Sequence, residues 1–458
     1  MIGPILAIIV TVIMAKCILM RWRAQFVILF GGLFLLFAAT ALGPVGSILP
    51  SKVASTGTWV FDPFKCMASI FSSRTAGLGL IIMSATGYAK YMDVIGASKV
   101  MSRVMTSPLR LLKSPYLVVG LSYIIGQIVN IFIPSAAGLG TLLMVTMYPV
   151  LVRLGVSPLA ATALVGTTAC LDLGPASGNS NLAAKNAGLD PVEYFVAYQI
   201  PIAIATMLVI AILHIIVQKY YDKKDGFVPD PAVVGDIAEE KEEDKAPGLY
   251  FFLPILPLAL LLVFSRFAIK SIKLDVPTAM FFSFVLAIIL ELIRHRHSVK
   301  KVLDDAMDFY NLMGRQFAYV MTLIVAGEVF AQGLMATGTV KLLIESVQGL
   351  GWGAAGITVA MTLLISITAI VMGSGNAPFF AFASLAPTIA KDMSINAVSI
   401  LLPMQLAAGI ARSVSPITGV IVAVSGMSGV SPFDVVRRTA IPMFGGLIVM
   451  TILSIVLY

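Results

Sequence analysis

The sequence predicts an all-α, polytopic membrane protein made of two inverted repeats, each with a re-entrant helical hairpin and a broken transmembrane helix. The first observation is composition: of 458 residues, 59% are hydrophobic and 12% are charged, and the mean hydropathy is +0.97. A soluble domain is far less apolar than this. The second observation is that glycine- and proline-containing stretches interrupt apolar segments at matching positions in both halves. Such interruptions persist at membrane depth only where protein or a water-filled cavity covers them.

Apolar segments that approach the roughly 20 residues needed to span the hydrocarbon core occur about ten times along the chain. The first of them, residues 2–20, is predicted to be a retained helix and not a signal peptide, because Arg21 and Arg23 follow it instead of preceding it. Residues 219–247 are rich in Asp, Glu and Lys and are predicted to form a flexible cytoplasmic linker between the two halves.

Basic residues gather in short loops, which predicts the orientation of the chain by the positive-inside rule. The two clusters contain Lys99, Arg103, Arg110 and Lys113, and Arg294, Arg296, Lys300 and Lys301. With both clusters in the cytoplasm, both termini are predicted to be periplasmic in a multi-pass protein of a bacterial inner membrane. The net charge of +8 is then a feature of topology. Membrane lipid is the expected surrounding, and no nucleic-acid partner is expected.

Four short stretches of glycine, proline and hydroxyl residues interrupt the apolar sequence. They are residues 134–140, 174–181, 373–378 and 413–419. The first two align with the last two, since Ser135 and Ser374 are 239 positions apart and Pro175 and Pro416 are 241 apart. An odd number of predicted crossings separates the copies, so one copy is inverted relative to the other, an architecture that places a binding site at the bilayer midplane.

Each copy is predicted to be a hairpin followed by a broken helix. The hairpins are expected at about 115–154 and 353–391, with tips at 135–140 and 373–377, and the helices are expected to unwind at 174–181 and 413–419. Repeat-based alternating access predicts an elevator, in which these elements move as one transport domain against a scaffold. The predicted parts are the N-terminal scaffold (1–113), transport repeat 1 (114–218), the linker (219–247), the second scaffold (248–350) and transport repeat 2 (351–458).

The predicted tips and breaks have the chemistry of an anion site. Helices that start inside the membrane direct free N–H groups and partial positive charge into a cavity. Small residues let the backbone approach a ligand, and neutral side chains supply hydrogen bonds. Two carboxylates joined by a short carbon chain fit between two facing tips. The predicted substrate-binding residues are Ser135, Ala136, Gly138, Ser177, Gly178, Asn179, Gly373, Ser374, Gly375, Asn376, Arg412, Ser415, Thr418 and Gly419.

Ionisable residues at membrane depth are functional candidates because a charge there is costly. Arg412 is predicted either to bind a carboxylate through its guanidinium fork, to pair with Asp172, or to lie at a helix boundary. Asp172 and Glu328 are candidate coupling residues, with a hydrogen bond between Glu328 and Gln332 as the alternative. The coupling ion, H⁺ or Na⁺, stays open.

Cysteine and histidine spacing argues against a metal centre or a cofactor. Cys17, Cys66 and Cys170 are scattered without CxxC spacing, and the three histidines lack metal-ligand spacing. No metal, no cofactor and no catalytic residue is therefore predicted.

Several segments resemble the DcuC family of anaerobic C4-dicarboxylate carriers along the whole chain. These segments are residues 373–382, 412–426, 431–439, 54–57, 138–144 and 330–334. The resemblance implies exchange of fumarate for succinate, or succinate efflux, by a proton-coupled or an exchange mechanism, that is, by symport or antiport. It also implies a distant similarity to the ion-transporter superfamily, whose members are homodimers with a moving transport domain. Hairpin tips in that superfamily read Ser-Asn-Thr, whereas in this chain they read Ser-Ala-Ala and Ser-Gly-Asn. This departure from the motif argues against sodium coupling of the superfamily's kind.

The predicted function is thus secondary active transport of C4-dicarboxylates such as succinate, fumarate and malate, by a homodimer and not by an enzyme. A carrier of the same fold for another carboxylate, such as citrate or a short-chain acid, is the main alternative. An intramembrane hydrolase is the alternative from another class, since Ser374 lies in Gly-Ser-Gly, but no candidate base accompanies it. A channel is disfavoured because closed hairpins suit alternating access better than a permanent pore.

Overall fold

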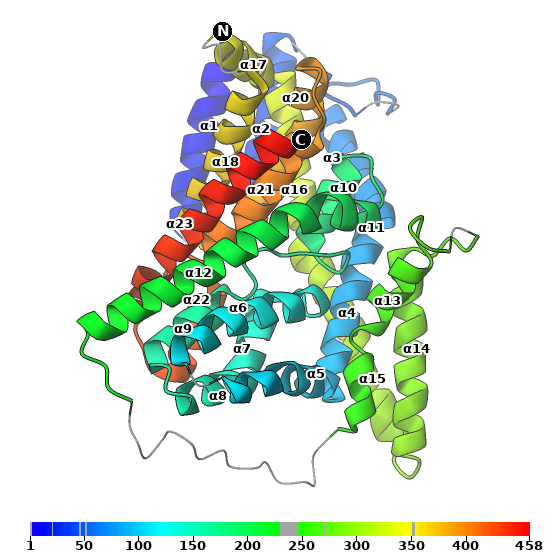
Figure 1. Cartoon of the computed structure of the whole chain (residues 1–458). Helices are drawn as coiled ribbons and strands as arrows, with labels where there is room; N and C mark the ends of the chain where they lie inside the picture. The colour runs from blue at the N-terminus through cyan, green and yellow to red at the C-terminus, as the bar shows by residue number, and fades with distance from the viewer. Residues whose placement is uncertain are drawn as a thin grey trace.

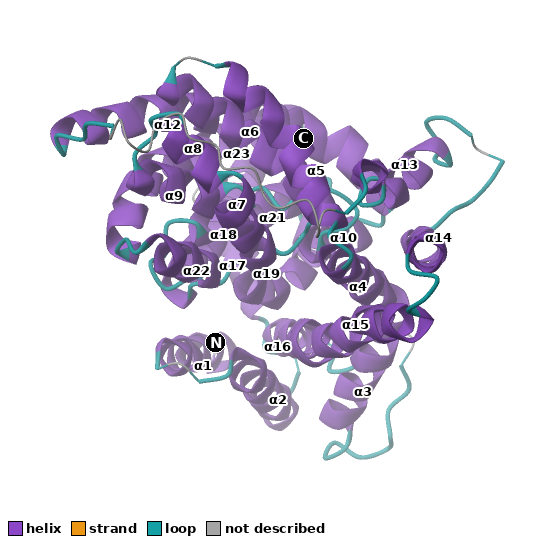
Figure 2. Ribbon diagram, turned by 90° about the horizontal axis from the view of Figure 1, so that it is seen from below, coloured by secondary structure: helices purple, strands orange, loops and turns teal. Residues whose placement is uncertain are grey.

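The computed structural model describes residues 2–20, 22–44, 47–50, 53–112, 114–229, 246–269, 271–349 and 353–458. Within these ranges the chain is helical with connecting loops and contains no strand, as predicted (Figure 2). Arg21, Lys113 and residues 230–245 of the predicted linker lie outside the described residues.

The helices follow one another along the two halves of the chain. In the first half they are α1 (Ile2–Leu19), α2 (Ala24–Leu42), α3 (Asp62–Arg74), the π-helix η1 (Thr75–Gly79), α4 (Leu80–Val94), α5 (Ala97–Thr106), the 3₁₀ turn η2 (Ser107–Leu111), α6 (Pro115–Phe132), α7 (Ala136–Thr146), α8 (Tyr148–Arg153), α9 (Pro158–Thr167), α10 (Gly178–Asn186), α11 (Pro191–Glu193), the π-helix η3 (Tyr194–Gln199) and α12 (Ile200–Lys224). In the second half they are η5 (Gly248–Phe252), α13 (Leu256–Val263), α14 (Val276–Arg294), α15 (Val299–Gln316), the π-helix η6 (Phe317–Met321), α16 (Thr322–Ala336), α17 (Thr339–Gly349), α18 (Gly353–Met372), α19 (Asn376–Phe382), η7 (Ala383–Leu385), α20 (Ala386–Asp392), α21 (Val398–Arg412), α22 (Gly419–Ser428) and α23 (Pro432–Leu457).

Eight helices of the described chain are long and apolar enough to cross a membrane. Three of them are compound: α3, η1 and α4 form one helix from Asp62 to Val94, α11, η3 and α12 form a second from Pro191 to Lys224, and α15, η6 and α16 form a third from Val299 to Ala336. The shorter apolar helices include α7, α9, α21 and α22, which are the arms of hairpins and broken helices. The count of about ten apolar segments from sequence therefore mixes complete spans with half-spans.

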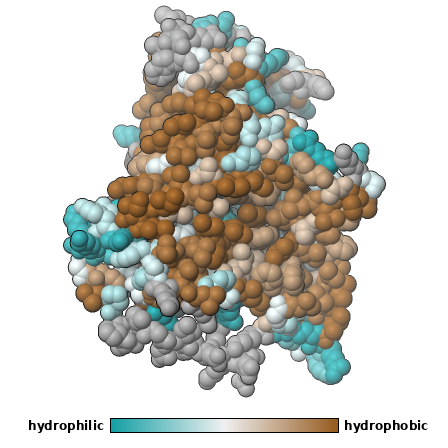
Figure 3. All heavy atoms as spheres, in the orientation of Figure 1, coloured by the Kyte–Doolittle hydropathy of each residue, from teal (hydrophilic) through white to brown (hydrophobic). Residues whose placement is uncertain are grey.

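Apolar side chains cover much of the molecular surface, which is the reverse of a soluble protein. On α1, Ile5 and Ile8 are 57% and 56% exposed, and Ile448 and Ile452 on α23 are 59% and 55% exposed. Figure 3 shows this apolar surface across the middle of one face, with hydrophilic residues toward its margins. The chain is a multi-pass membrane protein whose exposed helix faces suit contact with lipid.

The helices pack in two groups (Figure 2). In one group, α2 packs against α1 and α16, α16 against α3, and α4 against α14 and α15. In the other, α18 packs against α21, α12 against α6 and α23, and α22 against α7 and α9. Contacts of α16 with α19 and of α4 with α10 join the two groups. Elements of both halves of the sequence therefore contribute to each group.

A buried ion-pair network joins α12 to α23. The Arg438 side chain is 3% exposed, and its guanidinium lies 2.5 Å from Asp222 Oδ1 and 2.7 Å from Asp225 Oδ2. Ser157 Oγ donates to Asp222 Oδ1 at 2.7 Å, and Gln218 Nε2 donates to the Arg438 carbonyl at 3.1 Å. The charge of Arg438 is thus balanced inside the protein, as a buried cation requires.

Both predicted helix breaks are present, but the first begins earlier than predicted. The second lies between α21 and α22, at residues 413–418, against a prediction of 413–419. The first lies between α9 and α10, at residues 168–177, against a prediction of 174–181. Positive φ angles at Asp172 (51°) and Gly174 (90°) lie in this break. Ser177 then caps α10, with its Oγ accepting from Ser180 N, so residues 178–181 are helical.

Candidate functional site

A cavity of about 280 Å³ lies where both hairpin turns and both helix breaks meet. Its lining residues are Ile82, Thr86, Pro134, Ser135, Ala136, Ala137, Asp172, Gly178, Asn179, Gln316, Val320, Gly373, Ser374, Gly375, Asn376, Phe380, Arg412, Thr418, Gly419 and Val420. Stretches separated by more than two hundred residues in sequence therefore surround one space.

Both hairpin turns are short, and the second packs closely against a neighbouring helix. The first turn ends at Ser135, whose Oγ accepts from Gly138 N at 3.2 Å and so caps α7. The second turn runs between α18 and α19 and contains Gly375. A Cβ at Gly375 would collide with the backbone carbonyl of Ala408, so glycine lets this turn rest directly on α21.

One asparagine connects the two halves of the chain inside the cavity. Asn179 Nδ2 donates to Asp172 Oδ2 at 2.7 Å and to Asn376 Oδ1 at 3.0 Å. The first contact stays within the broken segment of the first half, and the second reaches the hairpin turn of the second half. In this arrangement the Asn376 amide nitrogen has no protein partner in the described chain and is available to a ligand.

Two buried glutamines satisfy the irregular backbone of the first break. Gln405 Nε2 donates to the carbonyls of Leu171 (3.2 Å) and Asp172 (3.1 Å). Gln199 Nε2 donates to Gln405 Oε1 at 2.7 Å, and Gln199 Oε1 accepts from Gly174 N at 3.1 Å. Non-helical backbone at membrane depth needs such partners. Sequence reasoning missed both residues, although a glutamine within an apolar span is a usable signal.

Arg412 is the one cation among the residues that line this cavity, and Asp172 is the one acid. Arg412 is the last residue of α21, and its Nη2 donates to the Ala169 carbonyl at 2.8 Å. Thr418 Oγ1 donates to the Arg412 carbonyl at 2.6 Å, a hydrogen bond that joins the two ends of the second break. Asp172 is 6% exposed and bonds Asn179, and no ion pair with Arg412 is formed within the described chain. Of the three interpretations of Arg412, the helix boundary is observed, and Asp172 lies close enough to interact with its charge without forming a close ion pair in the described chain.

Three of the predicted substrate-binding residues do not line the cavity. Gly138 lies in the first turn of α7, where its N–H is used by Ser135. Ser177 is fully buried as the cap of α10. Ser415 is fully buried within the second break. The other predicted residues, together with Asp172, all line the space.

Glu328 lies away from the cavity and is ion-paired. Its Oε1 is 2.5 Å from Arg74 Nε, and the two side chains are 10% and 20% exposed. Glu328 thus bonds within the helix bundle, but its partner is Arg74 and not Gln332, whose Nε2 donates to the Ser47 carbonyl at 2.6 Å. Arg74 Nη2 also donates to Asn186 Oδ1 at 3.2 Å, at the end of α10. Arg74 thus joins α16 to the broken helix of the first half.

Sequence reasoning also missed the wall of the cavity that comes from other helices. Ile82 and Thr86 belong to α4, Gln316 ends α15, and Val320 lies in η6. The single glycines near them, Gly79, Gly87 and Gly314, do not belong to the glycine- and proline-containing stretches on which the site prediction relied.

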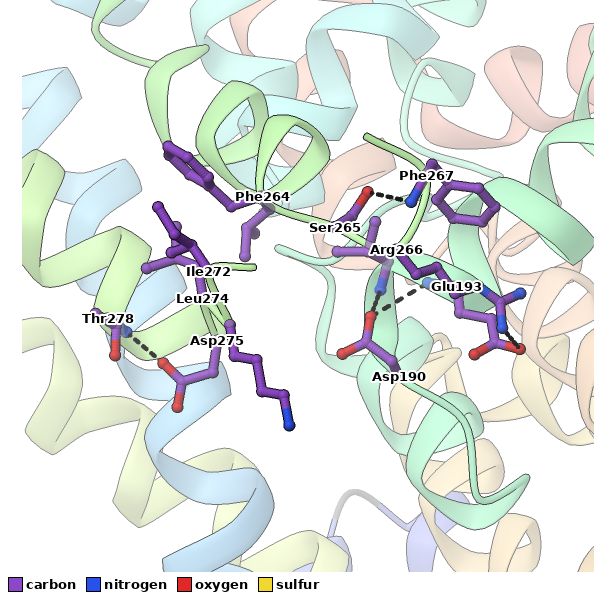
Figure 4. A pocket seen from close by; sticks show the side chains of 13 residues that line it. Asp190, Glu193, Phe264, Ser265, Arg266, Phe267, Ile272, Leu274, Asp275 and Thr278 are labelled. Carbon is purple, nitrogen blue, oxygen red and sulfur yellow. Dashed lines mark hydrogen bonds and ion pairs between the residues drawn. The ribbon is translucent and has the colours of Figure 1, made fainter. Parts of the chain in front are cut away.

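A second, larger cavity of about 620 Å³ lies between α11 and the chain that leads from α13 to α14 (Figure 4). Four of its charged residues are engaged by protein, since Arg266 Nη1 lies 2.8 Å from Glu193 Oε1, and Asp190 and Asp275 accept from backbone N–H groups at helix starts. Lys273 also lines this cavity. None of the hairpin or break residues lines it. The smaller cavity is therefore the better candidate for a transported anion.

Comparison with known proteins gives the family. The family model described as DcuC, C4-dicarboxylate anaerobic carrier, matches residues 2–458. The chain belongs to the DcuC family. A relative from Vibrio cholerae, named a probable anaerobic C4-dicarboxylate transporter DcuC, is 34% identical over 457 residues, covering 100% of this chain and 98% of that one. The Escherichia coli K12 anaerobic C4-dicarboxylate transporter DcuC is 34% identical over 448 residues, covering 98% and 95%.

Solved structures of other transporters share the fold of this DcuC-family chain. The Alcanivorax borkumensis YdaH transporter superposes with a TM-score of 0.61 at 16% identity, covering 95% of this chain and 98% of that one. MtrF of Neisseria gonorrhoeae, described with a class of antimetabolite efflux pumps, superposes with a TM-score of 0.56 at 15% identity, covering 94% and 95%. These structures show the fold, while the match to the family of C4-dicarboxylate anaerobic carriers makes the chain a transporter and not an enzyme.

Proposed function

We propose that this protein carries a C4-dicarboxylate, such as succinate, fumarate or malate, across the bacterial inner membrane and binds it in the 280 Å³ cavity. The observation that carries the proposal is a cavity with one arginine and the polar turns of both hairpins, in a chain matched throughout by C4-dicarboxylate carriers. The fold alone would not select this substrate, because one fold serves many substrates.

The lining has groups for two carboxylates. Arg412 supplies charge and donors to one of them. Ser135, Ser374 and the free amide of Asn376 supply neutral donors from the two turns. The first turn of α22 begins at Gly419 without a side-chain cap, so its N–H groups are also available. Donors on opposing turns fit an anion with charge at both ends better than a monocarboxylate.

Inverted repeats are the architecture that we propose for the chain, and helix starts support it. Ala136 and Asn376, which begin α7 and α19, are 240 positions apart, and Gly178 and Gly419, which begin α10 and α22, are 241 apart. The same spacing extends to η1 and η6, whose first residues are 242 apart. The proposed repeat therefore includes the compound helices that contain η1 and η6 as well as the hairpins.

An elevator follows from this architecture, with the division proposed from sequence. Residues 114–218 and 351–458 form the transport domain, and residues 1–113 and 248–350 form the scaffold of a homodimer. The two packing groups of helices are consistent with this division. Alternating access moves one repeat-based body against the other. Crosslinks between α4 and α10, which pack together, should arrest uptake, and full uptake in the crosslinked protein would contradict the elevator.

The proposed orientation puts both termini in the periplasm. In Figure 1, α5, which carries Lys99 and Arg103, and the turn between α14 and α15 lie at the end of the molecule opposite the N-terminus. The helix α5 and the turn between α14 and α15 thus share one end, which the positive-inside rule assigns to the cytoplasm.

The two hairpin turns should set substrate affinity. Asn376→Ala and Ser135→Ala each remove a donor to a carboxylate, and hydrogen bonds to charged groups contribute about 1.5–3 kcal/mol. Each variant is expected to raise the half-saturating succinate concentration about 10-fold or more in proteoliposome uptake. Asn311→Ala, at an exposed position of α15, is the matched control and should leave it unchanged. Unaltered affinity in both turn variants would remove the cavity as the binding site.

We propose Asp172 as the coupling residue and assign Glu328 a structural role with Arg74. A dianion entering beside the Asp172 carboxylate is repelled by it, and protonation of Asp172 removes that repulsion. Glu328 does not line the cavity, and its charge is balanced by Arg74.

At zero membrane potential, a gradient of one pH unit is expected to support about 10-fold succinate accumulation for one coupled proton, since one unit is about 1.36 kcal/mol. Asp172→Asn should abolish this accumulation while retaining exchange, and Glu328→Gln should retain it in the folded fraction. The reverse pattern would move coupling to Glu328. The measurement is labelled succinate uptake with the potential clamped.

Counterflow in proteoliposomes with mono-, di- and tricarboxylates, with and without sodium, tests the function itself. Succinate, fumarate and malate should drive counterflow in preference to citrate and butyrate. Preference for citrate or a short-chain acid would contradict the proposed substrate but not the proposal that the protein is a carrier. Sodium-dependent counterflow would replace the proton as coupling ion.

A further inference from the structure

One wall of the cavity belongs to the scaffold and not to the transport domain. It consists of Ile82 and Thr86 on α4, Gln316 at the end of α15 and Val320 in η6. The opposite wall consists of hairpin turns and breaks, which move together in the proposed elevator. A ligand in this conformation therefore touches both bodies.

Gln316 is the one scaffold residue that brings a free polar group to this wall. Ile82 and Val320 are apolar, and the Thr86 hydroxyl is used within its own helix, donating to the Ile82 carbonyl at 2.8 Å. The Gln316 side chain is half-buried and forms no hydrogen bond with other residues in the described chain. Its amide offers two N–H donors to a carboxylate.

The local backbone explains how Gln316 reaches the cavity. It is the last residue of α15, directly before the π-helix η6, and π turns inside α-helices frequently occur at functional sites. The π-helix η6 packs against the π-helix η1. The latter lies one turn before Ile82 on the compound helix from Asp62 to Val94. These two compound helices thus change pitch beside the cavity, and Gln316 lies where the change begins on α15.

We propose that Gln316 is a specificity-determining residue that binds the second carboxylate of the substrate from the scaffold, in this conformation only. The inference rests on the proposed function. Ligands such as Arg412 and Asn376 travel with the transport domain, but Gln316 stays with the scaffold. The bond to Gln316 is therefore made at one face of the membrane and broken during translocation. A neutral amide suits this role because it adds affinity for the carboxylate. A fixed cation would bind the dianion more strongly and so oppose its release from the scaffold.

The test measures affinity at each membrane face separately. Gln316→Leu and Gln316→Met both remove the amide, and methionine resembles the shape of glutamine more closely. The test can be made with either variant, provided that it folds. Transporters are reconstituted, sorted by orientation through an engineered surface cysteine, and assayed for half-saturating succinate from each side. The expected result is about a 10-fold increase at one face and less than about a 2-fold change at the other, as loss of one hydrogen bond to a charge predicts.

Substrate length provides a second readout. The ratio of succinate to butyrate affinity should fall about 10-fold in Gln316→Leu at the sensitive face, because butyrate lacks the second carboxylate. Gln332→Leu is the matched control on the same compound helix, since its amide bonds the Ser47 carbonyl instead of facing the cavity, and it should leave the ratio unchanged.

Equal effects of Gln316→Leu at both faces, or none at either, would overturn the inference. Its failure is distinguishable from failure of the proposed function. If Asn376→Ala weakens succinate binding and Gln316→Leu does not, the site stands and the scaffold contact is wrong. If the wild-type protein shows no succinate counterflow, both are wrong.

Discussion

Arg412→Gln is expected to reduce succinate counterflow at low substrate concentration about 100-fold. Arg412 is the one cation lining the cavity within the described chain, and the Asp172 carboxylate in the same lining would then repel the dianion unopposed. Losing a charge-assisted bond costs about 1.5–3 kcal/mol, and removing one member of a buried charge arrangement costs about 3–5 kcal/mol. Each 1.36 kcal/mol is about a factor of ten.

The identity of the cation should matter as well as its charge. Arg412→Lys keeps the charge but loses the fork that reaches the Ala169 carbonyl and a ligand together, so an intermediate loss of about 10-fold is expected. Arg437→Gln, at a 47% exposed position of α23, is the control and should transport normally. Folded yield of every variant is measured by size-exclusion chromatography. Wild-type affinity in Arg412→Gln would exclude this arginine from the substrate site.

Asp222→Leu is expected to cause the largest loss of stability, about 3–5 kcal/mol, because it leaves the guanidinium of Arg438 buried without its nearest partner. Asp225 remains at 2.7 Å but is 37% exposed and cannot replace the buried carboxylate. Thermal unfolding of the detergent-solubilised protein should shift down by about 5–10 °C. The midpoint for Arg437→Met, which removes an exposed neighbour of the network, should shift little.

The double variant Asp222→Leu with Arg438→Met separates charge from packing. Replacing both members of a buried ion pair by apolar residues is often neutral, so the double variant should recover most of the lost stability. A double variant less stable than Asp222→Leu would show that the charges themselves are not responsible. Transport per folded molecule should be normal in both variants, since this network does not line the cavity.

Local sequence patterns identify the parts of the site. They predict the second break to within one residue, because Arg412, Pro416 and Gly419 mark its ends in an otherwise apolar run. They place the first break too late, because α9 already ends at Thr167 and Asp172 adopts positive φ within the break, with no glycine or proline at either position. Ser177 then restarts the helix sooner than the glycine-rich pattern suggests.

The sequence by itself determined the membrane class, the family, the interrupted segments and most residues of the cavity, since hydropathy, helix-breaking residues and family motifs are local properties. Only the tertiary structure decided the partners: Asn179 with Asn376, Gln405 with the first break, Glu328 with Arg74, and Gln316 on the opposite wall. These pairs join helices that are distant in sequence. Their contacts depend on how whole helices pack against one another, and the local sequence around a residue does not predict that packing.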